Sequence, residues 1–324
     1  MATPQVFHSK EDMRAWSRAR RREGKTIGFV PTMGYLHEGH ISLVKAARER
    51  CDVVAASIYV NPTQFSKNED FGVYPRSEEE DLRKLAEAGC VAVFMPPTLY
   101  QPAGGNNGGD TSAAAAAGQG AAGGGADAGM VVGASEEADP ESHETWVTVE
   151  RLSQGLCAKS RPHFFRGVCT VVSKLFHIVE PDAAFFGRKD YQQWRVIQRM
   201  VRDLDMAVEV VGMPIVREAD GLAMSSRNAL LAPEDRQRCT CISAALFAAR
   251  DDACSGALVD AAALQARVAE AVAAGGGRVD YVEVADARTL RPLGGKLSGR
   301  SVLVAVAAFF GSVRLIDNVD FEAA

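Results

Sequence analysis

Residues 26–40, TIGFVPTMGYLHEGH, predict the fold. The first seven, residues 26–32, have the apolar character of a short buried strand. The histidine turn (residues 33–40) follows, and a helical pattern runs from Ile41 to Arg50. A strand that passes through a glycine turn into a helix aims unpaired backbone N–H groups and the positive end of the helix dipole at one place. That place favours a bound phosphate.

Two of the six histidines of the chain, His37 and His40, lie in this turn. Their imidazoles, three residues apart near a helix start, can face one side and donate to phosphate oxygens. Gly34 and Gly39 have no Cβ, so a ligand can approach the backbone closely. The turn therefore indicates an ATP site with chemistry at phosphorus. Alone, it also fits a chance surface turn. A zinc pair is a further possibility, but no Cys or acidic residue lies at a spacing that would complete a four-coordinate site.

Composition limits the classes of protein that the chain can belong to. Its 324 residues exceed one typical domain and predict two. With 47% hydrophobic and 24% charged residues, the chain has an ordinary globular composition. The net charge of −5 argues against a nucleic-acid partner, which usually needs a basic face.

The cysteines and the apolar runs predict a cytoplasmic protein without a membrane partner. The seven cysteines are scattered, odd in number and without a Cys-x-x-Cys pair, which is typical of reduced thiols. The N-terminal sequence MATPQVFHSKEDMRAW has no apolar core and carries acids early, unlike a secretory or transit peptide. The apolar run at 302–310 is too short to span a bilayer.

Strand and helix patterns alternate over the first hundred residues. Strands are predicted at 26–32, 52–60 and 90–95, and helices at 11–23, 39–50 and 78–88, with Ser9 and Asp12 as a capping pair. This alternation predicts a parallel sheet covered by helices on both faces. Ligands of such sheets bind at the carboxyl ends of the strands. The histidine turn and residues 61–65 (NPTQF) should therefore share one edge.

The second half is organised differently. Residues 103–134, nearly all Gly and Ala, predict a disordered surface insertion at about 101–145. Helices are then predicted at 167–179, 191–203, 234–250 and 258–273, and strands at 183–186, 207–213, 280–284, 301–310 and 313–316. The character changes after Pro214. We therefore expect a nucleotide-binding domain of residues 1–214 and a smaller α+β lid domain of residues 215–324.

Two further segments carry polar groups suited to a nucleotide. The lysine turn (residues 187–190, GRKD) again follows a strand and starts a helix. Lys189 can neutralise a phosphate, Asp190 can accept from ribose hydroxyls, and Gln193 can bind a polar substrate group. Alone, it fits equally a solvated helix start capped by Asp190. The serine loop (residues 224–227, MSSR) offers hydroxyls and a guanidinium to a polyphosphate, although such sequences are also common on surfaces.

Four motifs together closely resemble the pantothenate synthetase (pantoate–β-alanine ligase) family. They are VPTMGYLHEGH (30–40), YVNPTQF (59–65), FFGRKDYQQW (185–194) and VREADGLAMSSRN (216–228). The resemblance covers nearly the whole chain outside the insertion. It implies membership of the nucleotidyltransferase superfamily that shares the His-x-Gly-His turn with class I aminoacyl-tRNA synthetases. The implied fold is a Rossmann-like doubly wound parallel sheet with a smaller α+β C-terminal domain.

The resemblance also implies a reaction in two steps. The carboxylate of pantoate attacks the α-phosphate of Mg·ATP, giving pantoyl adenylate and pyrophosphate. The amine of β-alanine then attacks the acyl carbon, releasing AMP and pantothenate. Adenylyl transfer needs alignment and charge stabilisation rather than a protein nucleophile, which these residue types can supply. The implied assembly is a homodimer through the first domain.

The resemblance carries site roles over to particular residues. His37, His40 (the family's assigned proton donor) and Lys189 would be catalytic, and Gln64 and Gln193 would hold pantoate. The implied ATP site comprises Met33, Gly34, Tyr35, Leu36, His37, Glu38, Gly39, His40, Gly187, Arg188, Lys189, Asp190, Val216 (against the adenine), Met224, Ser225, Ser226 and Arg227.

A magnesium site and two departures complete the resemblance. The implied metal would lie near Glu80 and Asp81, which also fit a charged first helical turn, and metal bridging ATP phosphates needs few protein ligands. Arg188 stands where bacterial members usually have Glu, and Phe164 where they tend to have His, here shifted to His163. Both departures, and the insertion, resemble the plant and green-algal branch. We expect effects at the edge of the pocket rather than loss of activity.

Two other interpretations remain at this point. Another nucleotidyltransferase of the superfamily would release pyrophosphate without needing an amine. A catalytically dead homologue acting as a scaffold would be indicated by loss of His37, His40, Lys189 or Gln64, and none is lost. Pyrophosphate release with pantoate, measured with and without β-alanine, separates the two enzymes.

Overall fold

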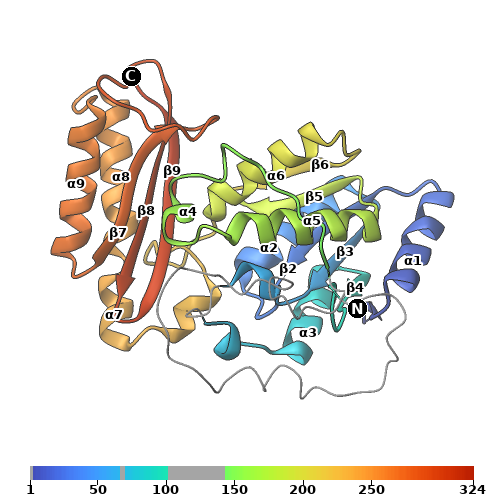
Figure 1. Cartoon of the computed structure of the whole chain (residues 1–324). Helices are drawn as coiled ribbons and strands as arrows, with labels where there is room; N and C mark the ends of the chain where they lie inside the picture. The colour runs from blue at the N-terminus through green and yellow to red at the C-terminus, as the bar shows by residue number, and fades with distance from the viewer. Residues whose placement is uncertain (1–2, 66–69, 101–142) are drawn as a thin grey trace, which may run out of the picture.

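The computed structural model describes residues 3–65, 70–100 and 143–324, which form two sheets (Figure 1). The first sheet has six strands in the order β1-β4-β3-β2-β5-β6, and every neighbouring pair is parallel. Its strands are β1 (Gln5–Phe7), β2 (Ile27–Thr32), β3 (Val53–Ile58), β4 (Ala92–Phe94), β5 (Ala183–Gly187) and β6 (Glu209–Met213). The predicted Rossmann-like parallel sheet is confirmed.

The order of the strands creates a crevice beside β2. Strands β3 and β4 follow β2 toward one edge of the sheet, whereas β5 and β6 lie on its other side. Ligands of doubly wound sheets bind at such a reversal, outside the carboxyl ends of the strands. β2 and β5 pair through Gly28–Ala183 and Phe29–Ala184. The histidine turn and the lysine turn, which follow these two strands, therefore face each other across the crevice.

Helices cover both faces of the first sheet. One apolar cluster packs α1 (Lys10–Arg22), α5 (Phe164–Val179) and α6 (Tyr191–Asp203) on one face. A second cluster packs α2 (Glu38–Arg50) and α3 (Glu78–Ala88) on the other. The predicted cap of α1 is confirmed, since the Asp12 backbone N–H donates to Ser9 Oγ at 3.0 Å and Ser9 Oγ donates to the Asp12 carboxylate at 2.8 Å.

The second sheet is antiparallel and packs against helices that cover the first sheet. It consists of β7 (Arg278–Asp286), β8 (Ser301–Phe310) and β9 (Val313–Glu322). α8 (Cys241–Cys254) and α9 (Ala261–Ala274) cover one face. On the other face Tyr281, Leu303 and Ala305 share a core with α5 and α6. Figure 1 shows β9 as the strand of this sheet beside the first domain.

Two predicted elements need correction, and one strand of the structure has no predicted counterpart. The helix predicted at 234–250 is two helices, α7 (Pro233–Arg238) and α8, separated at residues 239–240. The last strand continues to Glu322 instead of ending at 316, because the polar residues Asp317 and Asn318 interrupt its apolar pattern although both are buried. The short edge strand β1 was not predicted at all.

Two predictions, the domain boundary and the disordered insertion, are not tested by the structure. The change from one sheet to the other comes after β6, while the domain boundary at residue 214 stays a prediction. Residues 101–142 of the predicted insertion lie outside the described residues. Within the part of the chain that the structure describes, no helix is long and apolar enough to cross a membrane.

Candidate active site

Side chains of α3 hold the histidine turn through hydrogen bonds to its backbone. Gly34 and Tyr35 both have positive φ angles, 85° and 52°, so the chain turns sharply after β2. The Asp81 carboxylate accepts the backbone N–H groups of Tyr35 and Leu36, each at 2.7 Å. Lys84 Nζ donates to the Leu36 carbonyl at 2.8 Å. A Cβ at residue 34 would lie 3.1 Å from an Asp81 oxygen, which favours glycine there.

The two histidines of the turn cap α2 reciprocally. The Gly39 N–H donates to His37 Nδ1 at 3.1 Å, and the His37 N–H donates to His40 Nδ1 at 3.3 Å. The ring centroids are 4.1 Å apart. A Cβ on Gly39 would lie 2.8 Å from the His37 ring, so only glycine allows this arrangement. Because each Nδ1 accepts, the proton of each neutral ring is on Nε2.

Both rings are neutral near pH 7. Burial, assisted by the nearby Lys189 ammonium, lowers the pKa of His37 to about 4. Burial also lowers the pKa of His40 well below its usual range, assisted by His37 and Lys189. Each imidazole is therefore a hydrogen-bond donor through Nε2 rather than a charged group.

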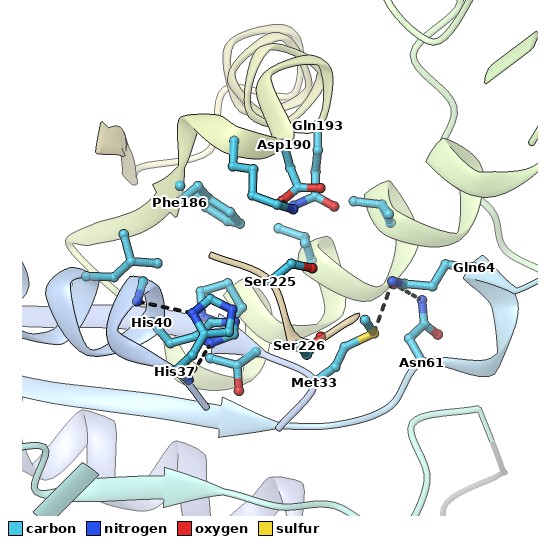
Figure 2. Close-up of a pocket in the computed structure, with 18 of the residues that line it drawn as sticks. Met33, His37, His40, Asn61, Gln64, Phe186, Asp190, Gln193, Ser225 and Ser226 are labelled. Atoms are coloured by element: carbon cyan, nitrogen blue, oxygen red, sulfur yellow. Dashed lines mark hydrogen bonds and ion pairs between the residues drawn. The ribbon is translucent and has the colours of Figure 1, made fainter. Parts of the chain in front are cut away.

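Both histidines line a pocket at the carboxyl ends of the central strands (Figure 2). The residues predicted from sequence that also line it are Met33, Gly39, Gln64, Gly187, Lys189, Asp190, Gln193, Val216, Met224, Ser225, Ser226 and Arg227. The histidine turn, the lysine turn and the serine loop thus meet at one cavity, although up to 190 residues separate them (residues 37 and 227).

Five residues assigned to the ATP site do not line this pocket. Gly34, Tyr35 and Leu36 shape the histidine turn. Glu38 is exposed, with its carboxylate 3.8 Å from Lys45 Nζ. Arg188 points to the second sheet and donates to the Asp320 carboxylate at 2.9 Å.

The lysine turn places one cation in the pocket. Lys189 follows β5, and its side chain is only 18% exposed. Its Nζ lies 3.6 Å from the carboxylate of Asp190, the residue that precedes α6. Figure 2 shows Asp190 and Gln193 together on this side of the pocket.

Gln64 is oriented by Asn61, which was not predicted as a site residue, and by Met33, which was. Its Oε1 accepts from Asn61 Nδ2 at 3.0 Å, and its Nε2 lies 3.1 Å from Met33 Sδ. Asn61 is fully buried, and its Oδ1 accepts from the Tyr100 hydroxyl at 3.0 Å. The signal for Asn61 was present, because it follows a predicted strand in the same NPTQF segment as Gln64.

Tyr74 and Arg161 also line the pocket and were not predicted as site residues. The Tyr74 hydroxyl lies 3.1 Å from Ser226 Oγ. Arg161 donates to the Gln64 carbonyl at 2.8 Å and stacks 3.9 Å over the ring of Phe164, the position of one predicted departure. Tyr74 and Arg161 stand outside recognisable patterns, and only the tertiary fold brings them to the site.

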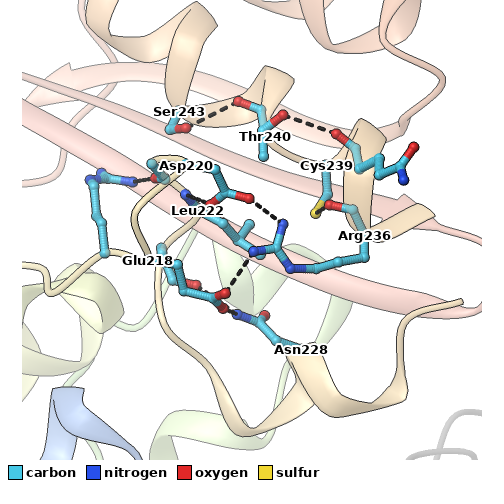
Figure 3. A network of polar contacts seen from close by, with 12 residues as sticks. Glu218, Asp220, Leu222, Asn228, Arg236, Cys239, Thr240 and Ser243 are labelled. Atoms are coloured by element: carbon cyan, nitrogen blue, oxygen red, sulfur yellow. Dashed lines mark hydrogen bonds and ion pairs between the residues drawn. The ribbon is translucent and has the colours of Figure 1, made fainter. Parts of the chain in front are cut away.

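Ion pairs from α7 hold the segment that leads into the serine loop. Arg236 donates to the carboxylates of Glu218 and Asp220, both at 2.6 Å. Asn228 Nδ2 donates to Glu218 at 2.8 Å, and Figure 3 shows these side chains linked in one network. At the start of the loop, the Met224 N–H donates to the Val216 carbonyl at 3.0 Å. The backbone around Ser225 and Ser226 is therefore fixed at both ends.

Glu80 and Asp81 do not fit as direct metal ligands. The Glu80 carboxylate pairs with Arg83 at 2.7 Å on the exposed face of α3. Both Asp81 oxygens already accept backbone N–H groups, and burial raises the pKa of this carboxyl. Among the described residues, no three or more His, Cys, Asp or Glu side chains are grouped to hold a metal ion. Asp81 braces the histidine turn.

This combination defines a class of enzyme. The sheet is doubly wound, and its His-x-Gly-His turn and lysine turn meet where the strand order reverses. This arrangement is typical of enzymes that bind a nucleotide.

Comparison with known proteins identifies the family. A family model described as Pantoate-beta-alanine ligase matches residues 5–320. The pantoate–β-alanine ligase of Oryza sativa subsp. japonica is 50% identical over 98% of this chain and 97% of its own length. That of Arabidopsis thaliana is 51% identical over 98% of each. The chain belongs to the pantoate–β-alanine ligase family, and its activity joins pantoate to β-alanine to produce pantothenate.

Solved structures agree with this assignment. Pantothenate synthetase from Thermus thermophilus has a TM-score of 0.79 and 39% identity, covering 98% of this chain and 99% of that one. The pantoate–β-alanine ligase of Francisella tularensis, solved with β-γ ATP and β-alanine, has a TM-score of 0.68 and 26% identity over 99% of both chains. The family resemblance found in the four motifs is confirmed.

Proposed function

We propose that this chain makes pantothenate at the pocket between the histidine turn, the lysine turn and the serine loop, with ATP as the activating substrate. The observation that carries the proposal is the juxtaposition of two neutral histidine donors and Lys189 where β2 and β5 end. The bound ligands of the Francisella tularensis relative support the choice of ATP.

In the first step, the ionised pantoate carboxylate attacks the α-phosphorus. The new bond joins the carboxylate oxygen to this phosphorus, and the bond to the β-phosphate oxygen breaks, so pyrophosphate leaves. His37 and His40 donate from Nε2 to oxygens on which negative charge accumulates, and Lys189 neutralises that charge. The neutral rings favour hydrogen bonding by His40 over full proton donation. Ser225, Ser226 and Arg227 hold the departing phosphates.

In the second step, the amine of β-alanine attacks the acyl carbon of pantoyl adenylate. A C–N bond forms, the C–O bond to AMP breaks, and the amine nitrogen loses a proton. Here the protein chiefly holds the reactants in line. Gln64 and Gln193 would bind the hydroxyls of pantoate, because a neutral amide can both donate and accept. Val216 would contact adenine, and Asp190 the ribose.

Three finer expectations belong to the proposal. Magnesium would enter with the ATP phosphates, since Glu80 and Asp81 are otherwise engaged. The protein would act in the cytoplasm, which agrees with its seven free cysteines. It would be a homodimer through the first domain, and sedimentation equilibrium would give the mass of the particle.

Product identification with pantoate, β-alanine and ATP tests the function. We expect AMP and pantothenate in equal amounts. Without β-alanine, pantoate alone should support exchange of labelled pyrophosphate into ATP, because adenylate formation is reversible. Exchange that does not need pantoate, or pyrophosphate release with no pantothenate, would contradict the proposal and favour another nucleotidyltransferase.

A further inference from the structure

Strand β9 carries two buried polar residues that the reaction does not use. Asp317 and Asn318 are each 4% exposed, in a strand whose other buried residues are apolar. Burying polar groups is costly unless they are hydrogen-bonded. Their side-chain partners lie outside the second sheet, in two segments that lead into the pocket.

Asn318 contacts the lysine turn. Its Nδ2 donates to the carbonyl of Arg188 at 3.0 Å and to the carbonyl of Lys189 at 2.9 Å. One amide group thus uses both of its N–H bonds on consecutive carbonyls of the same turn. The backbone from which the Lys189 side chain enters the pocket is therefore fixed by β9.

Asp317 contacts the segment that leads to the serine loop. Its carboxylate accepts from Arg217 Nη1 at 2.6 Å and from Nη2 at 2.9 Å. Arg217 Nη1 also donates to the Gly221 carbonyl at 3.0 Å, and the backbone of residue 217 bridges to Ala223. The Asn318 N–H donates to an Asp317 oxygen at 2.8 Å, which joins the two contacts.

We propose that Asp317 and Asn318 form a positioning pair, which sets the distance between Lys189 and the serine loop. The two phosphate-binding segments come from different parts of the chain, and β9 is the rigid element that both contact. This inference rests on the proposed function, because the distance matters only if both segments bind one polyphosphate. A misplacement of about 1 Å in such a site can cost on the order of 10² in rate.

The direct test is Asn318→Asp. This change keeps the shape of the side chain but replaces both donated N–H bonds with an oxygen that faces two carbonyls. We expect pantoate-dependent ATP–pyrophosphate exchange to lose on the order of 10² in kcat/KM for ATP. Pantoate binding, measured by calorimetry, should fall less than kcat/KM for ATP, because Gln64 lies on another element although Gln193 follows the lysine turn.

Asp320→Asn is the matched control. Asp320 lies on the same strand and contacts the same turn, but through the partly exposed ion pair with Arg188, whose side chains are 30% and 33% exposed. Exchange should stay within about fivefold of the wild type, as expected for a surface ion pair. A loss equal to that of Asn318→Asp would overturn the proposal, because general contact between the sheets would then suffice.

A double-mutant cycle separates positioning from general stability. If Asn318 acts through Lys189, Asn318→Asp should cost little further activity in a Lys189→Ala background. Full additivity would overturn the proposal. Should Asn318→Asp fail to fold, Asn318→Ser removes the same donors without adding charge and carries the same expectation. If the wild-type protein makes no pantothenate, the proposed function is refuted. If the wild type is active and a folded Asn318 variant is equally active, only the positioning role is refuted.

Discussion

Acidification should leave His37 uncharged far below the pH at which an ordinary histidine titrates. Burial in the capped turn, with Lys189 nearby, lowers its pKa from 6.5 to about 4. At about 1.4 kcal/mol for each pH unit, the difference corresponds to at most about 3 kcal/mol, since the ring is only partly shielded from water. This energy opposes charging of the ring in the folded protein.

The sign of the stability effect follows from proton uptake. Between pH 6.5 and about pH 4 the unfolded chain binds the proton and the folded chain does not. The contribution of His37 to the free energy of unfolding is therefore complete above pH 6.5. It decreases as the pH falls through this window and changes no further below it.

Nitrogen-detected NMR titration of the imidazoles measures the pKa directly, with His37→Asn to assign the signal. We expect the Nδ1 and Nε2 shifts to remain those of the neutral Nε2–H tautomer down to about pH 5. Urea unfolding at several pH values should show a steeper loss of stability below pH 6.5 in the wild type than in the variant. A His37 titration near pH 6.5 would refute the reasoning from burial.

Three further predictions concern the site. His37→Ala and His40→Ala should each lower pantoate-dependent pyrophosphate exchange by on the order of 10²–10³ while circular dichroism stays unchanged; near-normal exchange would contradict their role. Gln64→Ala or Gln193→Ala should raise the Michaelis constant for pantoate, through a lost hydrogen bond worth roughly 0.5–1.5 kcal/mol, with little change in ATP affinity measured by calorimetry. A fall in ATP affinity alone would reverse our placement of the substrates. Asp81→Asn should leave one N–H of the histidine turn unpaired and lower the free energy of unfolding in urea by roughly 1–3 kcal/mol, without changing the magnesium concentration needed for activity. A shifted magnesium requirement would restore Asp81 as a metal ligand.

The fold could be predicted wherever periodicity was strong. The apolar run of β2 and the amphipathic pattern of α6 have the expected bounds to within one residue. The end of β9 was lost because Asp317 and Asn318 look like loop residues until their partners in the first domain are known. β1 is three residues long at a sheet edge, too short for any alternation to appear.

The candidate site was predictable where its residues follow strands in sequence. His37, Lys189 and Gln64 stand directly after strands whose carboxyl ends meet, so topology alone brings them together. Asp81, which accepts backbone N–H groups of the histidine turn, was predicted to lie near magnesium instead. Its contact with Tyr35 spans 46 residues, so no local sequence pattern indicates it. Tyr74 reaches Ser226 across 152 residues in the same way.

The contact between β9 and the lysine turn also bears on how the protein is made. A ribosome synthesises the histidine turn early, and Asn318 follows His40 by 278 residues (318 − 40). A nascent chain that has emerged only as far as the serine loop already carries every residue that lines the pocket, yet its lysine turn lacks the strand that holds it. If the positioning pair acts as proposed, we expect such an incomplete chain to activate pantoate poorly, because its lysine turn lacks the hydrogen bonds from Asn318.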